Sequence, residues 1–259
     1  MKHNVLIDKE TDKDIDKEGE EMGQKQREAD QCWFITGTDT EIGKTYVSTL
    51  LLKALNRQGA KANGYKPVAS GAAKTPLGIK NPDAYSLLRA SYCDLDYEWV
   101  NPYFFPEEEA PHILAEKAGK AIEFEVMNRG LALLASKGKI TLVEGAGGWY
   151  TPLSFKRSYS DWVIENRLPV IVVVGLKLGV INHARLTFDA IEAAGLEITG
   201  WIANHLSDSP SLPNYIAGIQ AFTDIPMIGE IPYQAAADPA LMEKVDQYFD
   251  LDPLLKGVA

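Results

Sequence analysis

Cysteine is scarce in this chain of 259 residues, which has only Cys32 and Cys93 and no Cys-x-x-Cys pair. A disulfide framework and a cysteine zinc site are therefore excluded, and we expect the protein in the reducing cytoplasm. Long hydrophobic runs are also lacking, since the most apolar stretch, 170–176, is far shorter than the roughly 20 residues that cross a bilayer. We expect neither a membrane span nor a secretory signal, because the N-terminal region has no apolar core segment.

Basic residues are outnumbered: 26 Lys and Arg stand against 36 Asp and Glu, so the formal net charge is −10. An acidic surface repels phosphate backbones, and a nucleic-acid partner is not expected. Any anionic small molecule would need a local positive site. The remaining composition, 46% hydrophobic and 24% charged, is that of a globular protein with one or two domains.

The first 31 residues differ from the rest of the chain. They contain six Lys or Arg, ten Asp or Glu and no aromatic residue. Such a segment buries too little apolar surface to offset its ordering entropy, so we predict a disordered acidic extension over residues 1–31. No internal repeat or linker divides the remainder, and residues 32–259 are predicted to form one domain.

From residue 32 onward, short apolar runs alternate with stretches of helical periodicity. The run 170–174 is continuously β-branched, as expected for a strand buried on both faces of a parallel sheet. This alternation predicts an α/β domain with a mostly parallel sheet and helices on both faces. Strands are predicted at 32–36, 62–68, 140–143, 170–174, 198–203 and 227–229. Helices are predicted at 45–58, 83–91, 107–118, 123–136, 182–194, 211–222 and 239–249, with a long loop over 69–82.

The strongest chemical signal is Gly37-Thr38-Asp39-Thr40-Glu41-Ile42-Gly43-Lys44-Thr45, which follows a predicted strand and opens a predicted helix. This is the context of a phosphate-binding P-loop, in which backbone N–H groups and the helix N-terminus face phosphate oxygens. Lys44 would reach the β- and γ-phosphates, and the Thr45 hydroxyl would bind Mg²⁺. One detail departs from the common pattern, because five residues rather than four separate the two glycines.

Polar residues follow several predicted strands, at the edge where ligands of open α/β sheets bind. Lys66 lies near the end of the second strand, and Glu144 directly follows the strand 140–143. An acid in that position resembles the carboxylate that holds Mg²⁺ in P-loop proteins, and the glycines after it permit close approach of a ligand. Asn204-His205 ends a late strand, where a nucleotide base could lie. Since the guanine-reading pattern Asn-Lys-x-Asp is absent, ATP is the expected nucleotide.

Simpler interpretations stay open for several of these residues. Lys66 could be a solvated surface lysine, and Asp83 could be the N-cap of the helix that it opens. The segment 179–182 opens another helix, and it could hold a carboxylate or be an ordinary loop-to-helix turn. His112 and His183 have no metal-ligand spacing and are interpreted as ordinary polar residues, although His183 near a helix start could help to bind an anion.

Five segments of the chain form one pattern, in the order Gly-Thr-Asp-Thr-Glu-Ile-Gly-Lys-Thr (37–45), Gly-Tyr-Lys-Pro-Val-Ala-Ser-Gly (64–71), Val-Glu-Gly-Ala-Gly-Gly-Trp (143–149), Leu-Gly-Val-Ile-Asn-His (178–183) and Gly-Glu-Ile-Pro (229–232). Together they closely resemble the dethiobiotin synthetases, ATP-dependent carboxylases that close the ureido ring late in biotin biosynthesis. The resemblance covers roughly residues 32–234, and the five-residue spacing of the P-loop is itself the family form.

The resemblance implies a P-loop enzyme that uses 7,8-diaminononanoate, CO₂, ATP and Mg²⁺. One amine takes up CO₂ to give a carbamate, whose oxygen attacks the γ-phosphate of ATP to give a carbamic–phosphoric anhydride. The second amine then attacks the carbonyl carbon and expels phosphate. The resemblance also implies a homodimer in which the substrate carboxylate reaches a helix N-terminus of the partner subunit, so that the substrate site lies near the interface.

The family pattern also implies roles for individual residues of this sequence. Lys44 and Lys66 are implied to be catalytic, flanking the transferring phosphoryl group and the carbamate. Mg²⁺ is implied to bind Thr45, Asp83 and Glu144. The substrate is implied to contact Thr40, Ser70, Gly179, Val180, Ile181, Asn182 and Tyr215. ATP is implied to contact Thr40, Glu41, Ile42, Gly43, Lys44, Thr45, Tyr46, Glu144, Gly145, Ala146, Gly147, Asn204, His205, Pro232, Tyr233 and Gln234.

The expected base site departs from the family pattern. The family often has Asn-Asp where this chain has Asn204-His205. A carboxylate only accepts hydrogen bonds, whereas a neutral imidazole donates or accepts, so the base selectivity of this chain could differ.

Three alternative functions share parts of the pattern. A nucleotide-switch ATPase of the partitioning or metal-delivery type, without ligase activity, usually carries a second lysine early in the P-loop, and residues 37–39 lack one. An amidoligase of the cobyrinate type would need an ammonia source and a glutaminase domain, for which no room remains after residue 250. A family member that binds nucleotide without catalysis is disfavoured by the intact set of catalytic and metal residues.

Overall fold

Six strands form the central sheet of the computed structural model, which describes residues 31–233 and 243–256 of the chain. In chain order they are β1 (Gln31–Gly37), β2 (Ala62–Tyr65), β7 (Ile140–Glu144), β8 (Val170–Leu176), β9 (Ile198–His205) and β10 (Met227–Ile231). Their order across the sheet is β10-β9-β8-β1-β7-β2, and every neighbouring pair is parallel. The predicted α/β fold with a mostly parallel sheet is confirmed.

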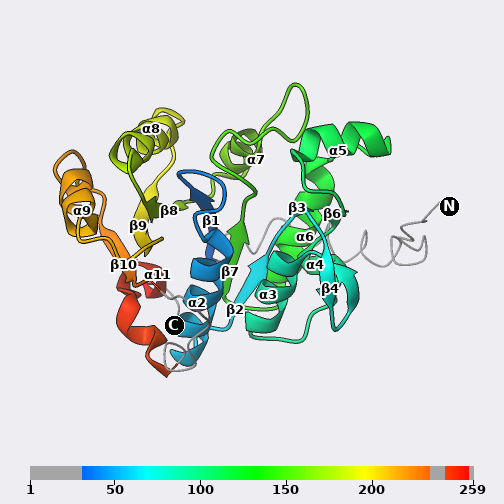
Figure 1. Ribbon diagram of the computed structural model, residues 1–259. Helices are drawn as coiled ribbons and strands as arrows, with labels where there is room; N and C mark the ends of the chain where they lie inside the picture. The colour runs from blue at the N-terminus through cyan, green and yellow to red at the C-terminus, as the bar shows by residue number, and fades with distance from the viewer. Residues whose placement is uncertain (1–30, 234–242, 257–259) are drawn as a thin grey trace.

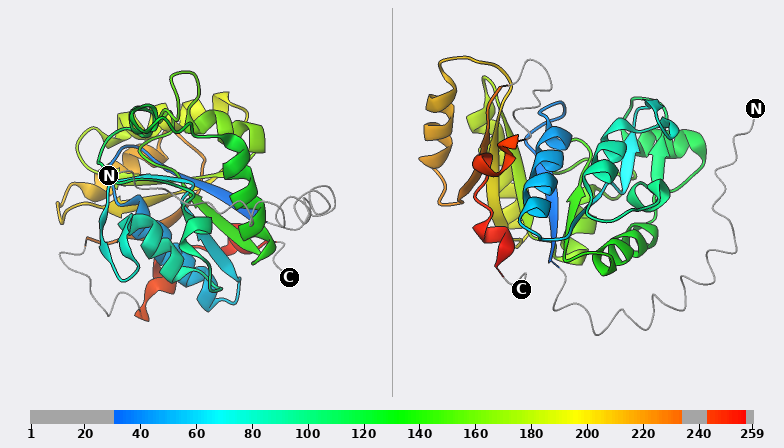
Figure 2. Two further views of the ribbon diagram at one scale, coloured as in Figure 1. Left: turned by 90° about the vertical axis from the view of Figure 1, so that its right-hand side faces the viewer. Right: turned by 90° about the horizontal axis from the view of Figure 1, so that it is seen from below.

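Helices cover both faces of this sheet, as Figure 1 shows. One face carries α2 (Lys44–Arg57) and α3 (Pro82–Ala90); the other carries α6 (Phe124–Ser136), α7 (Tyr159–Asn166), α8 (Val180–Ala193) and α9 (Leu212–Gln220). Alternate residues of β8 supply two different cores, because Val170 and Val172 pack with α6–α9 whereas Ile171 and Val173 pack with α2. A strand that is apolar on both sides requires a helix layer on each side, and Figure 2 shows these layers from two further directions.

Between β2 and α6 lies an insertion, residues 66–123, built from short elements. In it β3 (Val68–Ser70) pairs with β6 (Tyr103–Phe105), and β4 (Ala73–Thr75) pairs with β5 (Gly78–Lys80) as a hairpin. The insertion also contains α3, described above, together with α4 (Tyr97–Val100) and α5 (Pro111–Ala118).

The sequence predicted this region poorly. The single strand expected over 62–68 is wrong, because the chain leaves the central sheet after Tyr65. Pro67 has no N–H for a sheet ladder, and the N–H of Lys66 donates to the Val100 carbonyl at 2.8 Å instead. The loop expected over 69–82 is also wrong, since it contains the β4–β5 hairpin.

One helix of the structure was not predicted, and two further expectations concern the ends of the chain. The unpredicted helix α7 begins after Ser158, whose N–H and hydroxyl both donate to Asp161. The helix predicted over 239–249 is wrong where it is described, because η1 (Val245–Tyr248) is a single 3₁₀ turn, followed by α11 (Asp252–Leu255); residues 239–242 lie outside the described residues. The predicted extension 1–31 lies outside them too, apart from Gln31, the first residue of β1.

Candidate active site

Most of the predicted phosphate and metal residues lie at one edge of the sheet. The P-loop follows β1, Lys66 follows β2, Glu144 ends β7 and Asn204 lies at the end of β9. Because all neighbouring strands are parallel, their carboxyl ends share this edge. Residues that are distant in sequence are therefore brought to one site by the sheet topology.

The second glycine of the P-loop is required by its backbone conformation. Gly43 has φ 81° and ψ 27°, the left-handed region that disfavours side chains, and it is the N-cap of α2. A Cβ there would overlap the side-chain nitrogen of Asn204. That nitrogen donates to the Ile42 carbonyl at 2.7 Å, so Asn204 anchors the loop from β9. Its amide oxygen is the group left to accept a hydrogen bond from a ligand.

Two buried lysines form the cationic centre of the site. Lys44 Nζ donates to the Asp39 carbonyl at 2.7 Å. Lys66, only 4% exposed, donates to Glu144 Oε1 at 2.5 Å and to the Gly145 carbonyl at 3.2 Å. The interpretation of Lys66 as a solvated surface lysine is therefore wrong.

The two lysines respond differently to burial. Burial, together with the nearby charge of Lys66, lowers the pKa of Lys44 to about 8. Burial also acts to lower the pKa of Lys66, but the carboxylates of Glu144 and Asp83 outweigh it and raise that pKa. Lys66 is thus held as a cation, whereas Lys44 can lose its proton in mildly alkaline solution.

The acidic residues around Lys66 fit a small hard cation. Glu144 is fully buried, and its Oε1 accepts from the Thr45 hydroxyl at 2.7 Å. Its Oε2 is buried without a hydrogen-bond partner among the described residues, an arrangement that calls for a ligand. Asp83 lies 3.5 Å from Lys66 Nζ, on the first turn of α3. Oxygen donors of this kind suit Mg²⁺, which also takes substrate phosphates and water as ligands.

Asp83 is not the helix cap that one interpretation suggested. The N-cap of α3 is Asn81, whose side chain accepts from the Ala84 N–H at 3.0 Å. The carboxylate of Asp83 is therefore available to Lys66 and to a ligand. Within residues 31–233 and 243–256, no cluster of three or more His, Cys, Asp or Glu could hold a metal alone. A cation here would depend on Thr45 and on the phosphates of a bound nucleotide.

One residue at this edge, Lys177, was missed by the sequence analysis. Lys177, which directly follows β8, pairs with Asp39 of the P-loop at 2.6 Å. The other Asp39 oxygen accepts from the Thr40 N–H at 2.8 Å. The hydrogen bond from Lys177 is the main cause that lowers the pKa of Asp39. The signal that could have found Lys177 is its position after a buried strand, the same signal that identified Glu144.

The predicted carboxylate-binding residues lie on another part of the edge. Gly179 is the left-handed N-cap of α8, which begins at Val180 rather than at the predicted residue 182. Tyr215 is on the neighbouring helix α9. Three strand spacings, about 14 Å, separate β8 from β2 and Lys66. Within a single subunit, α8 and Lys66 are therefore not brought together at one site.

The other predicted residues are placed as follows. Thr40, Glu41 and Tyr46 belong to the P-loop and the start of α2, Gly145, Ala146 and Gly147 to the loop after β7, and Ser70 to the end of β3. His205 Nε2 lies 2.9 Å from Glu230 Oε1 on β10, and Pro232 and Tyr233 follow that strand. Gln234 lies outside the described residues.

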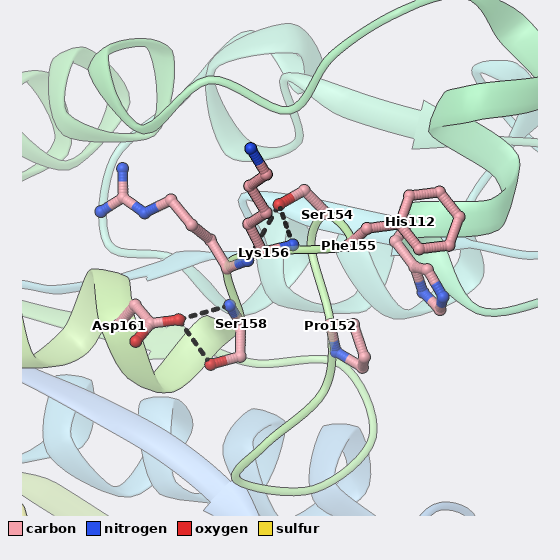
Figure 3. A pocket seen from close by; sticks show the side chains of 8 residues that line it. His112, Pro152, Ser154, Phe155, Lys156, Ser158 and Asp161 are labelled. Atoms are coloured by element: carbon pink, nitrogen blue, oxygen red, sulfur yellow. Dashed lines mark hydrogen bonds between the residues drawn. The ribbon is translucent and has the colours of Figure 1, made fainter.

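A separate surface pocket of about 310 Å³ lies between α5 and the loop before α7, and none of the predicted site residues lines it. Figure 3 shows His112, Phe155 and Lys156 around this pocket, with Asp161 accepting hydrogen bonds from Ser158. The rings of His112 and Phe155 meet edge to face at 5.3 Å. His112 is thus a packing residue of this pocket, in keeping with its interpretation as an ordinary polar residue.

The fold and the P-loop define the class of protein to which this chain belongs, the P-loop ATPases. A family model described as an AAA domain matches residues 31–240. Among solved structures, a ParA family ATPase from Chlorobium tepidum TLS is similar, with a TM-score of 0.50 and 15% identity. The similarity covers 88% of this chain and 92% of that one. At this identity the likeness supports the shared fold only.

Curated relatives define the family more narrowly. An ATP-dependent dethiobiotin synthetase of Serratia marcescens is 51% identical over 178 residues, 69% of this chain and 78% of that protein. The dethiobiotin synthetase BioD 1 of Escherichia coli O157:H7 is 48% identical over 204 residues, 78% of this chain and 91% of that protein. The chain therefore belongs to the dethiobiotin synthetases, the ATP-dependent cyclo-ligases of biotin biosynthesis. The resemblance seen in the sequence is confirmed, and the ligase is favoured over the nucleotide-switch ATPase.

Proposed function

We propose that this chain joins CO₂ to 7,8-diaminononanoate with consumption of ATP and releases dethiobiotin, ADP and phosphate. The observation that carries the proposal is the buried Lys66, which lies between Glu144 and Asp83 at the sheet edge that also holds the P-loop. A permanent cation at this point suits a reaction whose intermediates are anionic at carbamate and phosphoryl oxygens.

The reaction needs positioning and charge neutralisation rather than a protein nucleophile. An amine nitrogen forms a bond to the carbon of CO₂ and loses a proton to solvent. The carbamate oxygen then bonds to the γ-phosphorus while the bond to ADP breaks. The second amine attacks the carbonyl carbon, phosphate leaves, and a second proton is released. Lys44 and Lys66 would neutralise the oxygens on either side of the phosphoryl group.

Thr45, Asp83 and Glu144 would hold Mg²⁺. When bound, the ion supplies positive charge to the phosphate oxygens of ATP. The protein itself supports this role by burying the Glu144 carboxylate and by orienting it with the Thr45 hydroxyl and Lys66.

We also propose that the enzyme is a homodimer in which α8 of one subunit receives the substrate carboxylate of the other. The first N–H groups of a helix lack intrahelical partners and favour an anion. Around this helix start the chain exposes Leu178, at 87%, as well as Ile181 and Leu186. Apolar exposure of this kind is suited to contact with a second copy.

The base of ATP is proposed to lie beside Asn204 and His205, and Pro232 to Gln234 are proposed to border it. Asn204 supports this assignment because its side chain already contacts the P-loop. The cytoplasm is the proposed location, since a chain with two cysteines far apart in sequence suits a reducing compartment.

The decisive assay supplies ATP, Mg²⁺, bicarbonate and diaminononanoate and measures dethiobiotin by mass spectrometry. We expect dethiobiotin and phosphate to form together, and phosphate release to require the diamine. Steady phosphate release without diamine and without dethiobiotin would instead identify a nucleotide-switch ATPase.

The dimer is tested with two variants that impair different parts of the proposed shared site. Ile181→Pro removes one N–H from the first turn of α8, where proline is tolerated, and should raise the KM for the diamine but not for ATP. Mixing it with Lys44→Ala should restore activity, because one hybrid site is then intact. Mixed dimers with verified subunit exchange and no gain in activity would refute the shared site.

A further inference from the structure

Three buried polar side chains form a connected network inside the insertion. Asn81, Tyr97 and Asn101 are 2%, 5% and 3% exposed. The Tyr97 hydroxyl accepts from the Asn81 N–H at 3.0 Å and donates to Asn101 Oδ1 at 2.8 Å. The phenol thus bridges two asparagines, and we refer to these three residues as the Asn–Tyr–Asn network.

At one end of the network, Asn81 joins the start of α3 to the loop after β3. Its oxygen caps α3 through the Ala84 N–H, while its side-chain nitrogen donates to the carbonyls of Ser70 at 3.1 Å and Gly71 at 3.0 Å. Helix α3 carries Asp83 two residues later. One amide therefore sets the position of a proposed metal ligand relative to a proposed substrate contact.

At the other end, Asn101 holds the backbone of Lys66. Its side-chain nitrogen donates to the Lys66 carbonyl at 2.7 Å and to the Tyr103 carbonyl at 3.1 Å. The Lys66 N–H donates to the Val100 carbonyl at 2.8 Å. The peptide groups on both sides of Lys66 are thus fixed by one short segment, 100–101, rather than by the central sheet.

The burial of this network has a physical consequence. Buried amides and hydroxyls cost free energy unless they are hydrogen-bonded, and here every member of the network is hydrogen-bonded. Burial raises the pKa of Tyr97 to about 12, so its hydroxyl keeps the proton that it donates. An apolar core of equal volume would stabilise the fold as well, but it could not orient three separate loop segments.

We propose that the Asn–Tyr–Asn network positions three groups for the ligase reaction: the Lys66 ammonium, the Asp83 carboxylate and the loop that carries Ser70. This inference rests on the roles proposed above for those groups. Its members are positioning residues, since their side chains hold the Lys66 backbone and the start of α3 but make no contact with Lys44, Glu144 or the Lys66 ammonium among the described residues. A displacement of about 1 Å in a reacting group can cost about 10²-fold in rate.

The test compares Tyr97→Phe with Tyr103→Phe. The Tyr103 hydroxyl accepts from the Glu123 N–H at 2.9 Å and is buried in the same insertion, but it lies outside the network. Each variant removes one hydroxyl and leaves a backbone N–H without that partner. We expect Tyr97→Phe to lower kcat about 10-fold or more at unchanged ATP KM, and Tyr103→Phe to lower only the melting temperature. Equal kcat losses in both variants at similar melting temperatures would overturn the proposal.

A second variant separates the two tasks of Asn81. Asn81→Ser keeps an oxygen that caps α3 but loses the amide nitrogen that holds the loop of Ser70. Calorimetry should show diaminononanoate binding weakened about 10-fold, with the half-saturating Mg²⁺ concentration for ATP binding near that of the unmodified protein. Unchanged diamine binding would contradict the network's role at the substrate loop, whether or not Tyr97→Phe folds.

The outcome also distinguishes this proposal from the proposed function. If the unmodified protein makes no dethiobiotin, the proposed function fails. The network is then still tested by the Mg²⁺ concentration that half-saturates ATP binding, which should rise in Tyr97→Phe and not in Tyr103→Phe, while ATP binding at saturating Mg²⁺ stays unchanged in both. If the unmodified protein is active and the two tyrosine variants behave alike, the network proposal fails alone.

Discussion

The P-loop and the insertion of residues 66–123 supply opposite sides of one site in different ways. The P-loop is positioned by backbone: it joins β1, the central strand between β7 and β8, to the N-terminus of α2 through a left-handed Gly43. The insertion has strands of three residues, and it is positioned by buried side-chain amides and a phenol. Regular main-chain structure thus presents the proposed phosphate-binding groups, and a few polar side chains orient the proposed substrate-binding groups.

This difference predicts how each region tolerates substitution. Backbone N–H groups are present whatever the side chain, so the P-loop should tolerate change except at Lys44 and Thr45, whose side chains have proposed roles, and where backbone conformation or close packing forbids it. The insertion depends on specific hydrogen-bonding side chains, so conservative replacements there should affect activity.

Lys66 stands where the two regions meet, and its loss should have the largest effect. Lys66→Met keeps the apolar stem but removes the cation, so we expect kcat to fall about 10²–10³-fold. It also leaves the buried Glu144 without its ion-pair partner, which should cost about 3–5 kcal/mol of stability. The double variant Lys66→Met/Glu144→Gln should recover much of the melting temperature but none of the activity. Recovery of activity in the double variant would refute a catalytic role for this lysine.

Gly43→Ala tests the backbone dependence of the P-loop. A left-handed alanine costs about 1–2 kcal/mol, and its Cβ would also overlap Asn204. We expect ATP affinity, measured by calorimetry, to fall by roughly 5- to 30-fold, with diamine KM at saturating ATP unchanged. Adding Asn204→Ala removes the overlap but not the strain and should restore only part of the affinity. ATP binding by Gly43→Ala at the normal affinity would show that the loop does not need this conformation.

The lowered pKa of Lys44 predicts a pH dependence of nucleotide binding. The free enzyme should lose ATP affinity as the pH rises through about 8, because the lysine then loses its positive charge. In Lys44→Arg the guanidinium stays charged, so its affinity should stay level over the same range. An identical decline in both proteins would assign the titration to another group.

The contribution of Lys44 to the free energy of unfolding should rise with pH, whereas its contribution to ATP affinity should fall. The pKa of Lys44 is about 8 in the folded protein against an ordinary value of 10.5, so the unfolded chain binds more protons between these values. The free energy of unfolding contributed by Lys44 therefore rises with pH in this window. Denaturant unfolding of the unmodified protein and of Lys44→Met at matched pH measures the difference.

The smallest effect is expected at the ion pair between Lys177 and Asp39. Both side chains are about 40% exposed, so the pair is screened by solvent and contributes about 0.2–1 kcal/mol. Lys177→Met should weaken ATP binding by up to about fivefold, less at high salt, and Lys177→Arg should retain affinity. Arg185→Met, which breaks the exposed pair with Asp189 on α8, is the control and should leave ATP binding unchanged. A larger loss that persists at high salt would indicate direct contact of Lys177 with the nucleotide.

Prediction from sequence succeeded for the strands of the central sheet and failed for the strands of the insertion. The six central strands were found because short, mostly apolar runs alternate with stretches of helical periodicity, although the second was extended too far past Tyr65. The strands of the insertion were missed because they are three residues long and because the β4–β5 hairpin exposes Leu77 and Ile79. Short, partly exposed elements carry almost no periodic signal.

The sequence by itself determined the parallel sheet, the P-loop at the start of α2 and the acid at the end of β7. These features depend on local periodicity and on backbone geometry that neighbouring residues impose. Only the tertiary structure decided that Lys66 is buried between two carboxylates, and that Asn81, Tyr97 and Asn101 are joined. Asn81 and Tyr97 are 16 positions apart, and Asn101 and Lys66 are 35 positions apart. The irregular segments between them follow a path that no local pattern specifies. Hydrogen bonds between such segments form only once the sheet and the hydrophobic cores have fixed where the chain runs.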